Sequence, residues 1–203
     1  MKPFYKNRII TCDYPCSDTI HNFIYPGFKG NDEDIAIMII SESPPQNHNN
    51  YYYRNIDGNF FLSTQTAFND AGIKITSYED LTEMGIYLTT AIKCPKNNYL
   101  VSAGTIKECA DRFLENEIFR FSRLKVIMCM GDFAIKSVNY IFRKKYGTYP
   151  IKKGSTYKIR KEQHIFNGIT FIPSYTQTGD SFNIEKSKRL MISEDIALAL
   201  SIV

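Results

Sequence analysis

Short apolar runs alternate along this chain with longer segments of helical period, and this alternation limits the folds available to it. The runs at 35–41, 86–94 and 125–130 have the length and composition of buried strands. Between and after them, segments 102–122 and 132–145 carry apolar side chains at three- and four-residue spacing, as amphipathic helices do. Strands separated by helices favour a mostly parallel sheet covered by helices on both faces. We therefore expect an α/β fold.

The remaining segments are shorter and complete the expected order of elements. We predict helices at 63–72 and 78–84, the second capped by Ser77, and a terminal helix over about 184–200. Segments 157–160 and 164–173 are predicted to form a hairpin-like pair around Asn167-Gly168, which includes the final strand, and 174–183 a polar loop.

The size of the chain suits a single domain over residues 1–203. Its 203 residues are 43% hydrophobic, enough to bury a core. The longest apolar stretch, 35–40, is far below the roughly 20 residues that cross a bilayer, and residues 1–8 lack the apolar core of a signal peptide. These features predict a cytoplasmic protein without a membrane partner. The formal net charge of +4 permits contact with a polyanion but does not require it.

Five cysteines in a cytosolic chain argue against a disulfide framework, so metal binding, catalysis or packing must explain them. Cys129 lies inside an apolar run and is predicted to be a small core residue. Cys12 and Cys16 stand in a polar loop, whereas Cys94 ends a predicted strand and Cys109 lies in a predicted helix. These two pairs, distant in sequence, could converge as four thiolates.

Three polar loops follow predicted strands, at 41–48, 89–94 and 173–181. Ligands of open parallel sheets bind at the carboxyl ends of the strands. These loops are therefore the places to look for chemistry.

Seven features of the chain stand in the order found in the uracil-DNA glycosylase superfamily, and the chain most closely resembles its iron–sulfur branch, family 4. They are the pair Cys12/Cys16, Ser-Glu-Ser-Pro-Pro at 41–45, Asn-Phe-Phe-Leu at 59–62, the strand 87–94, Cys109, Met130-Gly131 and Thr-Gln-Thr at 176–178. The resemblance covers nearly the whole chain. It implies three layers, α/β/α, around a central, mostly parallel four-stranded sheet.

For the cysteines, the resemblance implies a [4Fe-4S] cluster held by Cys12, Cys16, Cys94 and Cys109, with residues 1–30 as the cluster-binding segment. Thiolate ligands suit iron–sulfur chemistry. A tetrathiolate zinc site is the alternative, although the wide spacing of the second pair fits it poorly.

The resemblance also implies roles for the loop residues. A glycosylase flips a base into a pocket, stacks it on a ring and reads its edge. The implied catalytic residues are Glu42, which would orient water, together with Thr176 and His48. The residues implied to contact the base are Ser43, Phe61 (or its neighbour Phe60) and Thr90. The implied DNA contacts are Ser174, Thr178 and Ser181, with Phe182 as a wedge in the base stack, and Lys186, Lys188 and Arg189 as further phosphate contacts.

Four positions differ from the family's motifs. Thr90 replaces an edge-reading Asn, Thr176 replaces a His, and Ser41 and Pro45 replace glycines of the first motif. A single hydroxyl cannot make the two-point contact of an amide. The sequence therefore leaves three candidates for the substrate base: uracil, a deaminated purine and a modified pyrimidine.

The leading hypothesis is a DNA glycosylase that hydrolyses the N-glycosidic bond of a flipped uracil or other damaged or modified base, with DNA as partner and a monomeric chain. The competing hypothesis is a DNA-binding or scaffold protein that has kept the fold and lost catalysis. A third is an enzyme acting on a free nucleotide or RNA.

Overall fold

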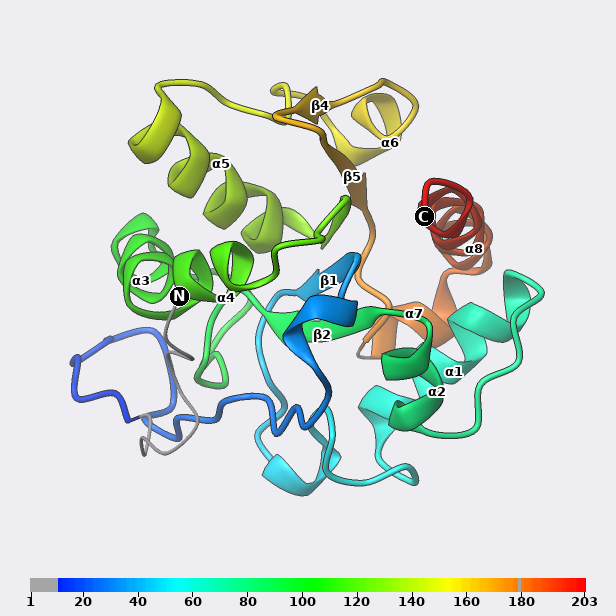
Figure 1. Ribbon diagram of the computed structural model, residues 1–203. Helices are drawn as coiled ribbons and strands as arrows, with labels where there is room; N and C mark the ends of the chain where they lie inside the picture. Colours follow the sequence, from blue (N-terminus) through cyan, green and yellow to red (C-terminus); the bar gives the residue numbers. More distant parts are fainter. Residues whose placement is uncertain (1–10, 179) are drawn as a thin grey trace.

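The computed structural model describes residues 11–178 and 180–203 and contains one sheet with strand order β2-β1-β3-β5-β4 (Figure 1). The strands are β1 (Ile37–Ser41), β2 (Ile86–Thr90), β3 (Val126–Met130), β4 (Ile165–Phe166) and β5 (Ile169–Ser174). Strands β2, β1, β3 and β5 are parallel neighbours, and β4 pairs antiparallel with β5. The mostly parallel sheet is confirmed, but it has five strands rather than four.

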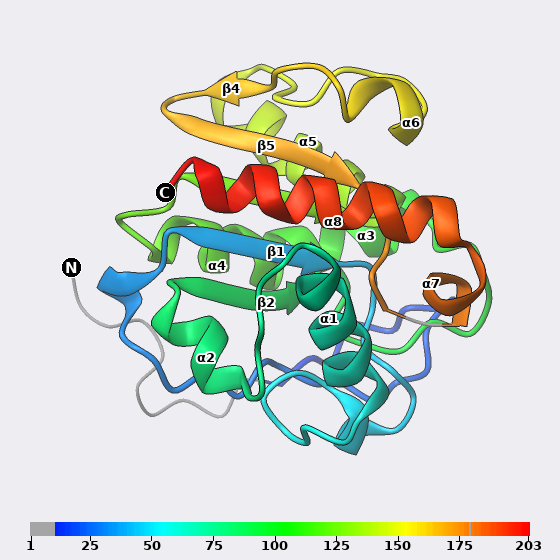
Figure 2. The same ribbon diagram turned by 90° about the vertical axis from the view of Figure 1, so that its right-hand side faces the viewer.

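Helices cover both faces of the sheet, so the three layers are confirmed (Figures 1 and 2). One face carries α3 (Ala103–Cys109), a π-helical segment (Ala110–Leu114), α4 (Glu115–Arg120) and α5 (Asp132–Tyr146). The other carries α1 (Asn59–Asp70), α2 (Tyr78–Glu83) and α8 (Lys186–Ser201). The short α6 (Thr156–Ile159) and α7 (Asp180–Ile184) flank β5, and 3-10 turns lie at Asp32–Asp34 and His48–Asn50.

Alternation along the central strands explains the two cores. In β1, Met38 and Ile40 join the core beneath α3 to α5, whereas Ile37 and Ile39 join the core beneath α1, α2 and α8. Every residue of β1, β2 and β3 is buried, as expected for parallel strands covered on both faces. Cys129 is fully buried in the first core, in agreement with its predicted packing role.

Local signals place several element boundaries. Ser77 and Asp80 form a reciprocal capping box at the start of α2, and the Ser102 hydroxyl accepts from the Thr105 amide at the start of α3. The turn between β4 and β5 uses Asn167 and Gly168, both with positive φ, as predicted for an Asn-Gly hairpin.

Three expectations about the elements were wrong. Residues 157–159 belong to α6 rather than to a strand, and α1 begins at Asn59 instead of residue 63. A short helix, α7, occupies part of the predicted polar loop at 174–183. Each difference lies in a short segment, where a pattern of a few residues is weak and tertiary packing decides the conformation.

Among the described residues, no helix combines the length and the apolar character needed to cross a membrane.

Candidate active site at the carboxyl edge of the sheet

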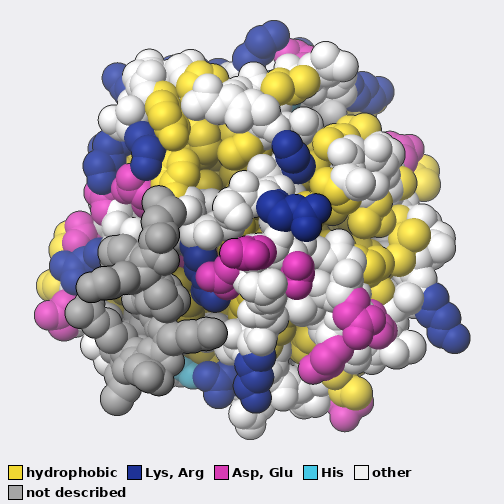
Figure 3. Space-filling view, viewed as in Figure 1, with side chains coloured by type: hydrophobic (Ala, Val, Ile, Leu, Met, Phe, Trp, Pro, Cys, Tyr) yellow, Lys and Arg dark blue, Asp and Glu magenta, His cyan; other side chains and the backbone are white. Residues whose placement is uncertain are grey.

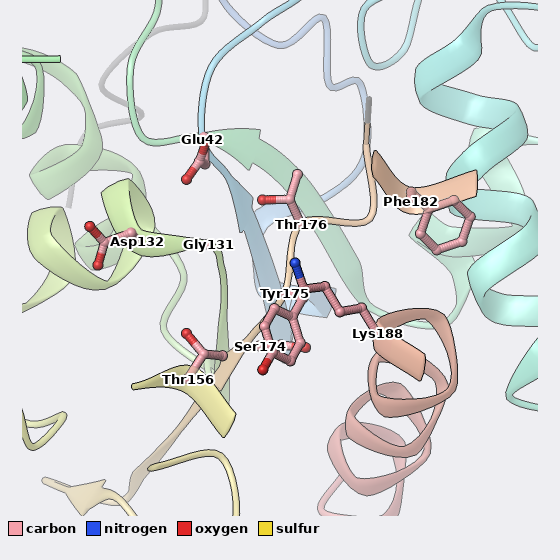
Figure 4. Close-up of a pocket in the computed structure, with 9 residues that line it drawn as sticks. All are labelled: Glu42, Gly131, Asp132, Thr156, Ser174, Tyr175, Thr176, Phe182 and Lys188. Carbon is pink, nitrogen blue, oxygen red and sulfur yellow. The ribbon is translucent and has the colours of Figure 1, made fainter. Parts of the chain in front are cut away.

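A cavity of about 250 Å³ opens where β1, β3 and β5 end (Figure 4). Three of the strand-end segments contribute to it, and α6, α7 and α8 close its sides. Its lining residues are Glu42, Gly131, Asp132, Thr156, Ser174, Tyr175, Thr176, Phe182 and Lys188. This is the edge at which open parallel sheets bind ligands.

The side chains of Glu42 and Thr176 both lie against the backbone of Gly131. Gly131 has φ 104° and ψ 171°, a conformation that is essentially restricted to glycine. A Cβ atom built on it would lie 2.6 Å from Thr176 Oγ1 and 2.7 Å from Glu42 Oε1. The Thr176 hydroxyl donates to the Met130 carbonyl oxygen at 3.2 Å. The glycine after β3 therefore lets a carboxylate and a hydroxyl from two other strand ends share one space.

A lysine that the sequence did not single out holds the Glu42 carboxylate. Lys96 Nζ donates to Glu42 Oε2 at 3.0 Å, and the same ammonium lies 5.1 Å from the centre of the Phe133 ring. Both charged side chains are partly exposed, at 29% and 20% of their surface. The ion pair therefore fixes the direction of the carboxylate while leaving it open to the cavity. The only sequence signal for this role is the position of Lys96, just past the end of the predicted strand 86–94.

The opposite wall combines a second cation with a buried network. Lys188 Nζ lies 5.3 Å from the centre of the Tyr175 ring and is also paired with Glu185. Ser174 donates to Asp195 Oδ2 at 2.5 Å, and Asp195 pairs with the buried Arg160. Burial raises the pKa of Asp195 in spite of these partners. The Ser174 hydroxyl is thus committed to the interior. Among the described residues on the face in Figure 3, basic and acidic side chains lie side by side.

The ends of β1 and β2 are covered by tyrosines. Ser41 and Thr90 are partners in the parallel register. Ser41 Oγ lies 2.6 Å from the Tyr52 hydroxyl and donates to Gln177 Oε1 at 3.2 Å, and Thr90 Oγ1 lies 2.9 Å from the Tyr51 hydroxyl. All are fully buried or nearly so. Burial raises the pKa of both tyrosines, so both phenols are neutral at pH 7.

Several predicted site residues lie away from the cavity. His48 Nε2 is 3.0 Å from the Asn22 carbonyl oxygen, and the half-buried Ser43 is not among the lining residues. Phe61 is 1% exposed, with its ring 4.8 Å from that of Tyr78 inside the core. A base cannot stack on it in this conformation.

The structure also corrects the role of Phe182 and limits that of its neighbours. The Phe182 ring is 2% exposed, belongs to the core beneath α8 and points away from the cavity centre in Figure 4. A buried ring is not available as a wedge in a base stack. Its exposure depends on which face of α7 packs on the core, and the sequence pattern does not show this. Thr178 is buried, and the side chain of Ser181 lies outside the described residues.

The four predicted ligand cysteines share one neighbourhood. Cys16, Cys94 and Cys109 are buried and Cys12 is partly exposed, and all are free thiols. Burial, followed by the charges of Cys109, Cys12 and Cys16, raises the pKa of Cys94 to about 12. Mutual influence of this kind requires thiols from three distant segments to lie near one another. Among residues 11–178 and 180–203, no group of three or more His, Cys, Asp or Glu side chains is arranged to hold a single metal ion.

The segment that carries the first cysteine pair is hydrogen-bonded to the segment around the second. The Ile24 and Ile20 amides donate to the carbonyl oxygens of Lys93 and Pro95, both at 2.8 Å. Asp18 accepts from the Ser102 amide and the Thr105 hydroxyl, both at 2.6 Å. These contacts hold the segment that carries Cys12 and Cys16 against the segments that carry Cys94 and Cys109.

A buried ion pair that the sequence did not reveal lies next to the thiols. Lys93 Nζ is 2.7 Å from Glu117 Oε1, with both side chains fully buried, and it also donates to the Thr89 hydroxyl and the Thr90 carbonyl oxygen. The pair links the end of β2 to α4. Nothing in the local pattern distinguishes these two residues from charged residues on the surface.

These features together define a doubly wound α/β protein with a carboxylate-bearing cavity at the carboxyl edge of its sheet and four cysteines gathered at one side. Comparison with known families gives the more specific assignment. The family model of the uracil DNA glycosylase superfamily matches residues 28–191, and the chain belongs to that superfamily. The resemblance to this superfamily, stated from the motifs, is thereby confirmed at the level of the superfamily.

A curated relative is the type-5 uracil-DNA glycosylase of Thermus thermophilus, to which the chain is 27% identical over 103 residues. That match covers 50% of this chain and 46% of the relative, so the chain matches about half the length of that protein.

Proposed function

We propose that this protein is a DNA glycosylase that hydrolyses the bond between a flipped base and its deoxyribose and leaves an abasic site. Membership of the superfamily supports this reaction class. The observation that carries the proposal is the Glu42 carboxylate, which Lys96 fixes at the mouth of a strand-end cavity beside Thr176.

The chemistry follows from the position of Glu42. As the bond from C1′ to the base nitrogen breaks, its electron pair leaves with the base and positive charge develops on the sugar. A fixed carboxylate stabilises that charge and orients a water molecule toward C1′. The hydroxide of water adds to C1′, and the remaining proton goes to the departing base. Lys188 on the opposite wall offers an ammonium to the DNA phosphates.

The base is best identified by experiment, since the predicted edge reader Thr90 is already bonded to Tyr51. Purified protein is incubated with oligonucleotides that carry uracil, hypoxanthine, xanthine or hydroxymethylated or glucosylated cytosine, and then treated with alkali. Strand scission at one of these bases is the expected result. DNA binding without scission on any substrate would contradict the proposal and favour the scaffold hypothesis, which the covered ends of β1 and β2 also support.

We also propose that Cys12, Cys16, Cys94 and Cys109 hold a [4Fe-4S] cluster, which would fasten the N-terminal segment to the sheet. The soft thiolate donors and their shared neighbourhood support it. Anaerobically purified protein should contain iron and sulfide and absorb broadly in visible light.

The cysteines allow a matched control for this cluster. Cys109→Ser is expected to lose most of the iron, whereas Cys129→Ala, which alters a core cysteine outside the quartet, is expected to keep it. Colourless protein with stoichiometric zinc would contradict the cluster.

A further inference from the structure

The carboxyl edge of the sheet is divided into an open half and a closed half. The cavity residues come from the ends of β1, β3 and β5 and from α6 to α8, and none of them belongs to β2 or to residues 51–53. The end of β1 contributes to both halves: Glu42 lines the cavity, whereas Ser41 and its register partner Thr90, the last residues of β1 and β2, are fully buried. Ligands of such sheets enter at this edge, so what covers one half restricts what can bind.

Two consecutive tyrosines, Tyr51 and Tyr52, cover the ends of β2 and β1, and the next residue, Tyr53, bonds to the middle of β2. The hydroxyls of Tyr51 and Tyr52 are bonded to Thr90 and Ser41, and the Tyr53 hydroxyl accepts from the Leu88 amide of β2 at 2.7 Å. Tyr51 and Tyr52 are completely buried. Polar groups at the strand ends are thus satisfied by the chain itself, and none of these hydroxyls is left for a ligand.

The rings of Tyr51 and Tyr52 are also packed against each other and against Phe60. The centres of the Tyr51 and Tyr52 rings lie 5.2 Å apart, and the ring of Phe60 in α1 lies 5.9 Å and 5.0 Å from them. Tyr53 has φ 61° and lies in a turn directly after the pair. A single six-membered ring is the size of a pyrimidine. Tyr51 therefore fills a space of base size beside the carboxyl end of β2.

We propose that Tyr51 is a specificity-determining residue, whose ring occupies the β1–β2 half of the edge and confines the substrate base to the open half over β3 and β5. This inference rests on the proposed glycosylase function. In the open half, the groups within reach of a base are the carboxylates of Glu42 and Asp132, the hydroxyls of Thr156 and Thr176, and the Lys188 ammonium. Because Glu42 faces the sugar and Lys188 the phosphates, a base held there is read by Asp132, Thr156 and Thr176 instead of Thr90.

Free uracil is the first probe of this division, because its binding does not require catalysis. Tyr51→Ala should bind uracil about tenfold more tightly than the wild-type protein, since a space of base size beside the Thr90 hydroxyl has opened. Tyr51→Phe, which keeps the ring, should bind as the wild type does. So should Tyr87→Ala, which removes a fully buried tyrosine from the other core. Calorimetry measures the affinities.

Two results would overturn the inference: no gain for Tyr51→Ala, or an equal gain for Tyr51→Phe. If the alanine variant does not fold, Tyr51→Leu removes the ring and keeps an apolar side chain. The oligonucleotide panel is the second probe, in which Tyr51→Ala should shift the relative rates among bases by about tenfold or more while Tyr51→Phe preserves them. A protein that cleaves nothing would refute the proposed function and leave the uracil comparison intact as a test of the closed half.

Discussion

At the scale of single residues, Gly131 is the position on which the site depends most. Its backbone conformation excludes other residues, and the space above it is filled by Glu42 and Thr176. Gly131→Ala should therefore cost about 1–3 kcal/mol of folding free energy and also displace the carboxylate. Denaturation and excision assays on the same preparation measure the two effects.

Gly147 supplies the matched control for that substitution. It ends α5 with φ 74°, and a Cβ there would meet nothing within 4 Å. Gly147→Ala should cost stability through backbone strain and leave excision unchanged. Equal loss of excision in both variants would show that Gly131 acts only through stability.

Residue positions in the site were predictable where they follow a strand. Glu42 and Thr176 come directly after apolar runs, and parallel strands bring such positions to one edge. Phe61 and Phe182 were not predictable, because the exposure of an aromatic ring depends on which face of a helix meets the core. The position of Tyr51 was not predictable either, because its contact with Thr90 joins segments 39 residues apart.

At the scale of elements, the buried pair of Lys93 and Glu117 ties the end of β2 to α4. Lys93→Met leaves the Glu117 carboxylate buried without its partner and should cost about 3–5 kcal/mol of unfolding free energy. Urea denaturation measures the loss. In the double variant Lys93→Met/Glu117→Leu no charge is left uncompensated, so most of the stability should return. A double variant as unstable as the single one would argue against this explanation.

An ion pair between α1 and α8 gives a pH-dependent contribution. Arg189 Nη2 donates to Asp70 Oδ1 at 2.7 Å, and this hydrogen bond lowers the pKa of Asp70 below its usual value of 3.8. The carboxylate form is favoured by folding, so the contribution is present above about pH 4 and is lost as the pH falls through the lower, folded-state pKa.

Arg189→Leu should therefore be less stable than the wild type at pH 7 by about 0.2–1 kcal/mol, since the pair is partly exposed. The difference should shrink below pH 4. Unfolding curves between pH 3 and pH 7 test this, with Lys186→Leu as a control that removes the same charge from the same helix. A difference that is constant with pH would exclude the Asp70 pair as its source.

Elements with a strong sequence signal were predicted more reliably than the others. Helix α5 lies close to its predicted position because its periodicity extends over many residues, and β1 and β3 do so because each is a continuous apolar run. The four-residue α6, which was predicted as a strand, has too few residues for a clear pattern.

At the scale of the whole molecule, the proposed cluster joins the N-terminal segment to the rest of the chain. Removing iron by chelation should lower the melting temperature and speed amide exchange at Ile20 and Ile24, whose amides donate to Pro95 and Lys93. Exchange at Met128, in the centre of the sheet, should change little. Unchanged exchange at Ile20 and Ile24 after complete iron loss would contradict this role.

The central claim is that Glu42 promotes the breaking of a glycosidic bond. It is tested most directly by the single-turnover rate of base release from the preferred oligonucleotide, measured for the wild type, Glu42→Gln and Glu83→Gln. Glu83 is an exposed residue at the end of α2 and serves as the control for loss of one carboxylate. The account predicts a loss of about 10²–10⁴-fold for Glu42→Gln and no change for Glu83→Gln. A Glu42→Gln enzyme that releases the base at the wild-type rate would contradict it.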